Sequence, residues 1–548
     1  MNLTENQKYA LTKIENFISN DNDCFLLTGY AGTGKTFLLS EVVRSLKKLK
    51  LDFTLLAPTG KSARVFAKKS DCSVQTVHSA IYRIDDFVDD EKNDDNYFLK
   101  FELKTSPTKS NIFLVDEASL ISDIKTSNDY LEFGSGRLLC DLIYFTKDKT
   151  ANKKVKLIFC GDRAQLFPIG SNNAPALSKD YLEKEYNFKV EEIELTEVYR
   201  QLVGSNILKT ANNIRKNISE KVFNNFQIVV EGDIENWDIK PTHPPNSNKD
   251  KIIISYSNDS VYYYNQVVRK NIMNYPIDEI VVNEKMLVIL NNIKYGFSNG
   301  DIIKIKNINQ TTETVDVTLK KKKIQLNFLT VDLIFEDSNH YNLKLLINSA
   351  FNNERTIPFD EFIALRVDFE KRTGLKMPKK KLKTENYKQY KAIKENYLQT
   401  YSNDPYVNAL VVKFGYALTC HKAQGSEWDE VYIDFKRIGF SNEDFFRWAY
   451  TAITRAKEKL FILNSPSFSW DKFGILDTIT NKLINSSFKV LKTELLHYRF
   501  RLTISLKEKV SILDFIYNNK GKITVQKLDC ENETFQIINN IFVLNSSI

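Results

Sequence analysis

The chain has 548 residues, of which 42% are hydrophobic and 27% are charged, and its formal net charge is +8. This length exceeds one ordinary hydrophobic core, so we expect three or four domains with the composition of a soluble globular protein. No stretch reaches 18 apolar residues, which argues against a membrane span. The 77 basic and 69 acidic residues permit a polyanionic partner but do not establish one.

The six cysteines are scattered along the chain and form no Cys-x-x-Cys pair. We therefore expect neither a zinc site nor a disulfide framework, and a reducing, cytoplasmic compartment fits best. The first residues lack a basic region followed by an apolar one, so no signal peptide is expected.

From about residue 23 to 200, short apolar strands alternate with helices, which predicts a parallel sheet covered by helices on both faces. The strand candidates are residues 24–28, 53–57, 112–115 and 156–160. Residues 84–104 interrupt this pattern with an acidic run, followed by an apolar segment that partly alternates like a strand. We interpret this interruption as an inserted hairpin.

A second α/β pattern begins near residue 250 and resumes after a long interruption. Its predicted elements are a strand over 251–256, a helix over 260–271, and strands over 409–416, 430–435 and 459–464. Within the interruption, short alternating strands predict a small β-barrel. The predicted barrel strands are 301–308, 314–319, 323–328 and 331–335, and a basic, partly helical stretch follows at 376–394.

The tail, residues 468–548, shows no motif of known chemistry. Residues 511–525 could form two helices of a small winged-helix-like unit, with 534–543 as a third. The alternative is an added segment that docks on the rest of the chain or on a partner protein. Both interpretations stay open at this stage.

Residues 29–36 read Gly-Tyr-Ala-Gly-Thr-Gly-Lys-Thr, between a predicted strand and a predicted helix. In that context the glycine-rich turn and the helix N-terminus can cradle phosphates with backbone N–H groups. Lys35 can reach the β- and γ-phosphates, and the Thr36 hydroxyl can bind Mg²⁺. The sequence therefore predicts a nucleoside triphosphate site.

Residues 112–117 read Ile-Phe-Leu-Val-Asp-Glu, a strand that ends in two carboxylates. Beside the phosphate loop, Asp116 could hold Mg²⁺ and Glu117 could polarise the attacking water, which are the parts that phosphoryl transfer needs. Surface acids at a strand end would be the alternative, but the upstream loop favours the catalytic interpretation.

Further motifs follow in a set order. Gly161 to Pro168 reads Gly-Asp-Arg-Ala-Gln-Leu-Phe-Pro, and Leu195 to Gln201 reads Leu-Thr-Glu-Val-Tyr-Arg-Gln. Residues 416–427 and 449–456 contain Thr-Cys-His-Lys-Ala-Gln-Gly-Ser-Glu and Ala-Tyr-Thr-Ala-Ile-Thr-Arg-Ala. Over roughly residues 1–465, this series resembles the superfamily 1 helicases, and most of all their RecD/Dda-like branch 1B, which moves 5′→3′ on DNA.

The resemblance implies an α/β fold with two RecA-like P-loop domains. The implied first domain is 1–200, with the hairpin at about 84–104, and the second is 201–296 together with 405–467. Residues 297–404 would form an inserted SH3-like β-barrel subdomain, because Ser298-Asn299-Gly300-Asp301 resembles the turn that opens it. Residues 468–548 would be a C-terminal extension.

The resemblance also implies roles for residues around ATP and Mg²⁺. Gln7 resembles the glutamine that reads adenine, although an N-terminal glutamine is more often a surface residue. Gln165 resembles the γ-phosphate sensor, and Arg200 and Arg455 resemble the arginines that close on the γ-phosphate. The predicted catalytic residues are Lys35, Glu117, Gln165, Arg200 and Arg455. The predicted nucleotide-binding residues are Gln7, Gly29, Gly32, Thr33, Gly34, Lys35, Thr36, Asp116 and Glu427, with Thr36 and Asp116 as magnesium ligands.

Other motifs resemble the family's DNA contacts, which use small polar side chains and backbone amides. The predicted DNA-binding residues are Pro58, Thr59, Gly60, Lys61, Thr76, His78, Tyr97, Phe98, Thr419, His421, Lys422, Gln424 and Ser426. The two histidines could instead be structural. Tyr97, Phe98 and Phe101 could separate the duplex at the hairpin, or could pack the hairpin on the core.

Taken together, the sequence predicts an ATP-dependent DNA helicase that binds single-stranded and forked DNA. One alternative is a motor subunit of a larger nuclease or defence complex, with a partner bound through residues 468–548. A nucleotide-dependent binding switch is the other, and the water-orienting Glu117 argues against it.

Overall fold

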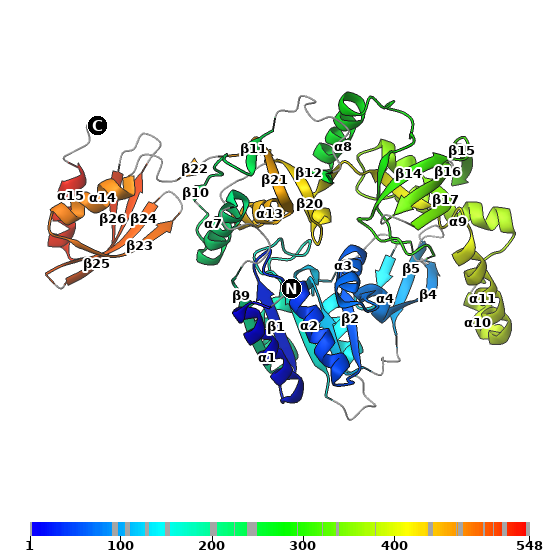
Figure 1. The fold of residues 1–548 in the computed structure, drawn as a ribbon, viewed down its shortest axis with the longest axis horizontal. Helices are drawn as coiled ribbons and strands as arrows, with labels where there is room; N and C mark the ends of the chain where they lie inside the picture. Colours follow the sequence, from blue (N-terminus) through cyan, green and yellow to red (C-terminus); the bar gives the residue numbers. More distant parts are fainter. Residues whose placement is uncertain are drawn as a thin grey trace.

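The computed structural model describes most of the chain, in segments separated by short gaps. The described residues are 3–89, 97–104, 110–125, 131–147, 154–197, 205–223, 225–237, 249–292, 294–319, 322–335, 339–378, 380–436, 442–466, 468–469, 475–496, 499–507, 509–517 and 523–543. Figure 1 shows two α/β domains facing each other, a barrel beside the second, and a separate C-terminal domain at the far side.

The first domain is built on a parallel sheet in the order β3-β2-β6-β8-β1-β9. Its strands are β1 (Cys24–Gly29), β2 (Phe53–Ala57), β3 (Gln75–Thr76), β6 (Ile112–Val115), β8 (Lys156–Gly161) and β9 (Val190–Leu195). Strands β1, β6 and β8 are buried along their whole length, because helices cover both faces, and this explains their continuous apolar runs.

Helices cover both faces of this sheet. One face packs on α1 (Glu5–Ser19), α2 (Lys35–Lys48) and α3 (Gly60–Ser70). The other packs on α4 (Val77–Ile81), α5 (Leu138–Thr146) and α6 (Lys179–Tyr186). Short 3-10 turns, η1 (Ala118–Leu120) and η2 (Pro175–Leu177), lie at the carboxyl ends of the strands.

The predicted hairpin is present. Strands β4 (Tyr82–Asp89) and β5 (Tyr97–Leu103) pair antiparallel, and β7 (Leu131–Phe133) adds to β5 in parallel. The Phe101 ring stacks on Phe133 with centroids 4.4 Å apart, so the base of the hairpin packs on the first domain.

The second domain has its own parallel sheet in the order β11-β21-β20-β12-β19. Its strands are β11 (Ile234–Asn236), β12 (Lys251–Ser255), β19 (Ala417–Thr419), β20 (Trp428–Asp434) and β21 (Ala456–Leu463). Its helices are α7 (Asn206–Glu220), α8 (Asn258–Val267), η3 (Val268–Ile272), α12 (Cys420–Ala423) and α13 (Glu443–Ile453). A short antiparallel pair, β10 (Asn225–Phe226) and β22 (Phe468–Ser469), lies beside it.

A barrel-like sheet interrupts the second domain. Its strands are β13 (Lys285–Val288), β14 (Ile302–Ile308), β15 (Glu313–Leu319), β16 (Lys322–Phe335), β17 (Asn339–Leu346) and β18 (Leu410–Phe414). The order is β14-β13-β18-β17-β16-β15, and β14 also pairs with β16, so the pairing closes on itself. The helical elements η4 (Asn348–Phe351), α9 (Phe359–Thr373), α10 (Lys380–Glu385) and α11 (Tyr387–Asn403) follow β17.

Three details of the sequence interpretation are wrong here. The strand predicted at 409–416 as a return to the second α/β domain is β18 of the barrel, and the return comes at β19 instead of at residue 405. Strand β13, inside the predicted 201–296 segment, also belongs to the barrel. The predicted strands 323–328 and 331–335 form one continuous strand, β16. Apolar runs alone do not say which sheet a buried strand joins.

The C-terminal domain is an antiparallel sheet in the order β23-β24-β25-β26, flanked by helices. Its elements are α14 (Ile475–Asn485), β23 (Lys489–Leu496), β24 (Arg499–Leu506), β25 (Lys509–Tyr517), β26 (Ile523–Asp529) and α15 (Asn532–Val543). The predicted helices within 511–525 are therefore wrong. Leu513 and Phe515 alternate toward one apolar core, which is the period of a strand.

Candidate nucleotide and DNA sites

The nucleotide cleft lies between the two α/β domains and receives residues from both. From the first domain it is lined by Gly32, Gly34, Lys35, Thr36, Glu117 and Gln165, and from the second by Ser426, Glu427 and Arg455. The structure thus brings most of the predicted nucleotide residues to one place, although they are up to about 420 residues apart in the chain.

The phosphate loop takes the form its sequence predicts. It joins β1 to α2. Gly32 and Gly34 have φ of 79° and 77°, values that residues with a side chain rarely adopt. The Lys35 ammonium donates to the carbonyls of Gly29 at 2.9 Å and Tyr30 at 2.8 Å, so it lies across the phosphate loop. To bind a phosphate, the ammonium would exchange these carbonyls for phosphate oxygens.

Gln7 is buried against this loop. It forms a capping box with Thr4 at the start of α1, and its Nε2 donates to the Thr33 carbonyl at 2.9 Å. A Cβ on Gly34 would lie 2.7 Å from that Nε2. The residue predicted to read adenine therefore also supports the phosphate loop, and it is not an ordinary surface glutamine.

Asp116 and Glu117 follow the end of β6 at the centre of the cleft. Asp116 accepts from the Glu117 N–H at 3.0 Å, and Glu117 has a φ of 53°. Burial and the Asp116 charge raise the pKa of Glu117 to about 7, against the opposing effect of Lys35 and Arg455. Within the described residues, Glu117 Oε2 has no hydrogen-bond partner although it is buried.

Arg455 forms the opposite wall of the cleft, in the turn between α13 and β21. Its Nε donates to the Thr451 carbonyl at 2.8 Å and its Nη1 to the Ser426 carbonyl at 3.2 Å, so the second domain holds the buried guanidinium in place. Arg200, the other predicted arginine, lies outside the described residues.

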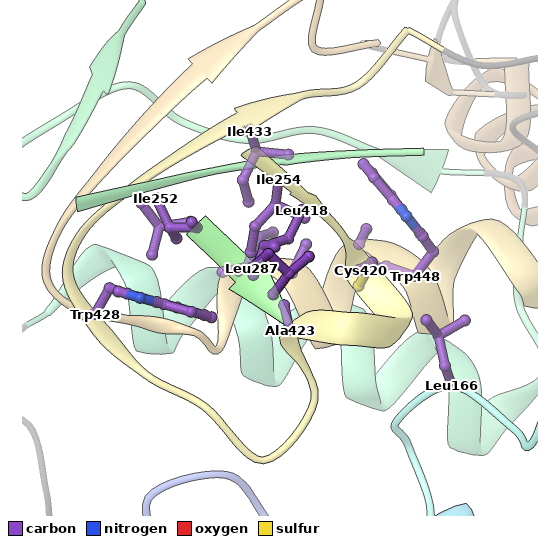
Figure 2. Close-up of a cluster of buried hydrophobic side chains, with 14 of the residues drawn as sticks. Leu166, Ile252, Ile254, Leu287, Leu418, Cys420, Ala423, Trp428, Ile433 and Trp448 are labelled. Carbon is purple, nitrogen blue, oxygen red and sulfur yellow. The ribbon is translucent and has the colours of Figure 1, made fainter. Parts of the chain in front are cut away.

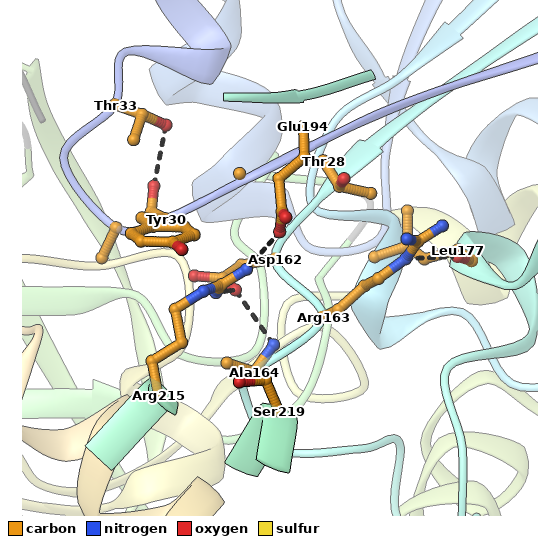
Figure 3. A network of polar contacts seen from close by, with 12 residues as sticks. Thr28, Tyr30, Thr33, Asp162, Arg163, Ala164, Leu177, Glu194, Arg215 and Ser219 are labelled. Carbon is orange, nitrogen blue, oxygen red and sulfur yellow. Dashed lines mark hydrogen bonds and ion pairs between the residues drawn. The ribbon is translucent and has the colours of Figure 1, made fainter. Parts of the chain in front are cut away.

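The loop that follows β8 connects the two walls. Asp162 is fully buried and forms an ion pair with Arg215 of α7 (Figure 3), and it accepts from the Tyr450 hydroxyl at 2.7 Å. Arg215 also pairs with Glu194 at 2.6 Å. Burial opposes ionisation of Asp162, but Arg215 and Lys35 outweigh it and hold its pKa below the usual range.

The second domain also grips the backbone of this loop. The Leu166 N–H donates to the Thr451 hydroxyl at 2.9 Å, and Gln424 Nε2 donates to the Leu166 carbonyl at 3.3 Å. Arg447 donates to the Gln165 carbonyl at 3.1 Å and lies 3.8 Å from the Phe167 ring. Figure 2 shows Leu166 beside Trp448 at the edge of the second-domain core, to which it belongs.

The sequence analysis gave no role to several residues that make these contacts between the two domains. They are Asp162, Arg215, Arg447, Tyr450 and Thr451. One available signal was spacing, since Arg447, Tyr450 and Thr451 are three and four residues apart and so share one face of α13. Their contacts across the domains still required the tertiary structure.

The predicted DNA motif at residues 58–61 lies at the start of α3. Thr59 caps the helix by accepting from Ser62 N, and the Lys61 ammonium lies 4.7 Å from the Trp428 ring. A Cβ on Gly60 would lie 1.6 Å from the Ser298 hydroxyl, so glycine here lets the barrel approach the first domain. Pro58 precedes this cap and is partly exposed.

Thr76 and His78 lie at the start of α4. Thr76 caps that helix through Ser79 N. The His78 ring lies 5.8 Å from Tyr82 and 5.2 Å from Phe133, and burial lowers its pKa to about 4. These contacts favour the structural interpretation of His78 over DNA contact.

The predicted DNA residues between 419 and 426 divide into two groups. Thr419 and Lys422 line a second cavity, next to the barrel, and His421 is exposed beside them. Gln424 and Ser426 are buried and turn toward the loop after β8 and the nucleotide cleft. Helix α12 ends at Ala423, so the second group follows the helix, and the chain turns within that group at Gly425, with a φ of 72°.

The side chains of Tyr97 and Phe98 lie outside the described part of the chain, although their backbone belongs to β5. No group of His, Cys, Asp and Glu suited to a metal ion occurs within the described residues. Over the same residues, no helix combines the length and the apolar character needed to cross a bilayer.

Comparison with known proteins agrees with this geometry. Residues 2–130 match the family model described as an AAA domain, and residues 414–463 match the UvrD-like helicase C-terminal domain. The two matches cover the phosphate loop of the first domain and the strands around Arg455 in the second.

Three similar proteins span most of the chain. The RecBCD enzyme subunit RecD of Buchnera aphidicola subsp. Schizaphis graminum is 24% identical, covering 85% of this chain and 74% of its own. The ATP-dependent DNA helicase dda of Enterobacteria phage T4 is 24% identical, covering 84% and 98%. The Pif1 helicase structure from Candida albicans is 16% identical, with a TM-score of 0.45, and covers 89% and 100%.

Proposed function

We propose that this chain, which belongs to the RecD/Dda-like branch of the superfamily 1 helicases, hydrolyses ATP between its two α/β domains and thereby moves along single-stranded DNA and unwinds duplex. The observation behind this proposal is the cleft itself. Lys35, Thr36 and Glu117 line it from one domain and Arg455 from the other. A site assembled from two domains couples hydrolysis to their closure.

Lys35 and the phosphate loop would bind the triphosphate. Backbone N–H groups at the start of α2 favour negative charge, and Lys35 can exchange its two carbonyl acceptors for phosphate oxygens. The Thr36 hydroxyl and the Asp116 carboxylate are the kind of oxygen donors that Mg²⁺ prefers, so they would hold it. When bound, Mg²⁺ neutralises charge on the phosphates.

Glu117 would orient and deprotonate the attacking water. Its buried Oε2 is unpartnered among the described residues, and it lies in the same cleft as Lys35. A carboxylate with a pKa near 7 is well suited to accept a proton at neutral pH. Arg455 would stabilise the charge that develops on the transferring phosphoryl group, and Arg200 would join it, as the resemblance implies.

Gln165 would report the state of the γ-phosphate to the second domain. Its side chain lines the cleft, its Oε1 is buried without a partner in the described part of the chain, and its carbonyl accepts from Arg447. A shift of Gln165 on hydrolysis would therefore act on α13 directly. This is a physical route from ATP to domain movement.

The single strand would cross both domains on the side of α3 and α12, in the 5′→3′ direction that the family resemblance implies. Backbone amides and hydroxyls at Thr59 and Thr419 suit phosphate oxygens. The β4–β5 hairpin, with Tyr97 and Phe98, would separate the strands of a fork.

The decisive experiment measures ATP turnover with and without a single-stranded oligonucleotide at low salt. Strong stimulation is expected in the wild type. Forks that carry a single 5′ or a single 3′ tail then test polarity, and only the 5′-tailed fork should be unwound. Turnover that DNA does not affect would contradict a DNA-coupled motor.

The C-terminal domain favours a second candidate, a motor subunit of a larger nuclease or defence complex. Residues 475–543 have their own apolar core, which includes Ile479, Phe500 and Phe515, and they supply no residue to the nucleotide cleft as far as the structure describes them. Such a domain can dock a partner without disturbing ATP hydrolysis. A protein that co-purifies with the full chain, but not with residues 1–467, would support this candidate.

A further inference from the structure

A second cavity lies where the barrel meets the second domain. We call it the cation pocket because cationic side chains line it. Its polar and basic lining comes from α8, the segment after η4, β18, and the end of β19 with α12. These residues are Asn258, Tyr262, Asn352, Arg355, Lys413, Thr419 and Lys422. In the part of the chain that the structure describes, it shares no lining residue with the nucleotide cleft.

Basic side chains from three segments meet in this pocket. Lys413 donates to the Asn352 carbonyl at 2.9 Å, whereas Lys422 and Arg355 find no hydrogen-bond acceptor among the described residues. Across the same residues, Lys413, Lys422 and Arg355 form no ion pair with a carboxylate. The nearby Glu354 is exposed, and it acts on Lys413 only at longer range.

The arrangement carries an electrostatic cost. Burial lowers the pKa of Lys413 to about 8, and burial together with Lys413 and Arg355 lowers the pKa of Lys422 to about 8. Lys413 and Lys422 are partly buried, whereas Arg355 is exposed. Like charges that meet at such a site repel each other, and an anion placed among them removes that cost. The amides of Asn258 and Asn352 add neutral donors, which an oxyanion also accepts.

The position of the pocket indicates the source of the anion. Thr419 and Lys422, which line it, lie at and just after the carboxyl end of the parallel strand β19, where ligands of α/β sheets bind. The path of the DNA strand in the proposed function also runs beside α12, which contains Lys422. A phosphodiester of that strand carries a single negative charge and two free oxygens, and it matches this set of donors.

We propose that the cation pocket binds one backbone phosphate of the single strand, with Lys413 and Arg355 as strand-binding residues outside the recognised helicase motifs. This inference rests on the proposed DNA-translocating function. Arg355 and Lys413 come from the barrel side, while Thr419 and Lys422 come from the second domain. A phosphate that contacts these residues would be bound by the barrel and the second domain together, which already share an apolar core.

The first test compares three charge-neutral variants, Lys413→Gln, Arg355→Gln and Lys304→Gln. Lys304 is exposed on β14 of the same barrel and does not line the pocket, so it is the matched control. Oligonucleotide affinity is measured by fluorescence anisotropy over a range of salt concentrations. Each pocket variant should bind about tenfold more weakly at low salt, and the slope of log K against log salt concentration should be smaller in magnitude by about 0.7.

A second test locates the phosphate. A set of oligonucleotides is made, each with one neutral methylphosphonate linkage at a different position. Wild-type protein should bind more weakly to the oligonucleotide whose neutral linkage falls at the cation pocket. For the Lys413→Gln variant, the neutral linkage at that position should cause little further loss of affinity, because the substitution and the neutral linkage remove the same contact. Thermal unfolding of each variant establishes that it is folded before binding is compared.

The outcomes separate this inference from the proposed function. Wild-type protein that binds no single strand would contradict the function itself. Wild-type binding with normal salt dependence, together with pocket variants that match Lys304→Gln, would overturn only the pocket assignment. That assignment would also be overturned if inorganic phosphate stabilised the wild type but not Lys413→Gln while their strand affinities agreed, because the pocket would then take free phosphate.

Discussion

The nucleotide cleft and the cation pocket both contain partly buried lysines, but their counter-charges differ. In the cleft, Glu117 and Glu427 lie among Lys35, Arg455 and other basic side chains, so groups of both signs meet before any ligand binds. In the pocket, Lys413, Lys422 and Arg355 meet without a paired carboxylate among the described residues. A site with both signs suits a metal–triphosphate and chemistry on it. A site with one sign suits binding alone.

The difference extends to how each site is held. The cleft is tied across the domains by Asp162, Tyr450, Thr451 and Arg447, so a change on one wall reaches the other. The pocket is bounded by the second domain and the barrel, which the Tyr262 hydroxyl joins by donating to the Phe351 carbonyl at 3.3 Å, and within the described residues it shares no lining residue with the cleft. We therefore expect mutations in the cleft to act on turnover, and mutations in the pocket to act on affinity and its dependence on salt.

The largest expected effect is on the phosphate loop. Lys35→Ala should abolish ATP turnover while weak DNA binding persists, because the lysine is proposed to bind the triphosphate and lies outside the cation pocket. Steady-state ATPase and oligonucleotide binding on the same preparation measure both. If turnover persists in this variant, the cleft is assigned to the wrong reaction.

Glu117→Gln keeps the shape of the side chain and removes its ability to accept a proton. We expect ATP binding to persist and hydrolysis to slow by at least ~100-fold, because positioned acid–base catalysis contributes about 10²–10⁴. Single-turnover hydrolysis and nucleotide binding separate the two effects. A near-normal rate would show that another group orients the water.

Tyr450→Phe tests the connection across the cleft. The hydroxyl donates to the buried Asp162 at 2.7 Å and accepts from the partly buried Ala31 N–H at 3.1 Å, so its loss leaves both groups without this partner. We expect DNA-stimulated turnover to fall by roughly tenfold, since an unsatisfied buried group costs about 1–3 kcal/mol. Tyr256→Phe, at an exposed tyrosine outside this network, is the control. Equal rates in both variants would make the bond dispensable.

The smallest expected effect is the pH dependence of strand affinity. Lys413 and Lys422 bind phosphate when protonated, with pKa values of about 8 in the free protein, and a bound phosphate raises these values. Affinity should therefore be complete below pH 8 and fall as pH rises through 8. The charged groups that act on them are Glu354, Arg355 and each other.

Binding of an oligonucleotide measured from pH 7 to pH 9 at constant ionic strength tests this dependence, and Lys413→Gln should flatten it. A wild-type affinity that is independent of pH over this range would mean that neither lysine changes its protonation on binding.

Much of the cleft could be predicted from local sequence. The phosphate loop needs glycines at positive φ followed by Lys and Thr at a helix start, and Asp116 and Glu117 need only a buried strand before them. Such features depend on a few neighbouring residues. The hairpin at β4 and β5 was predictable for the same reason, because its strands are adjacent in the chain.

The sequence by itself thus determined the alternation of strands and helices, the phosphate loop and the order of the motifs, since backbone propensity and side-chain period act over short distances. Only the tertiary structure decided that β18 joins the barrel, that β25 and β26 are strands, and that Lys413 and Arg355 meet Lys422. Those facts depend on contacts between residues far apart in the chain. An apolar run is compatible with a buried strand in any of several sheets, and only the packing of the whole core decides which sheet it joins.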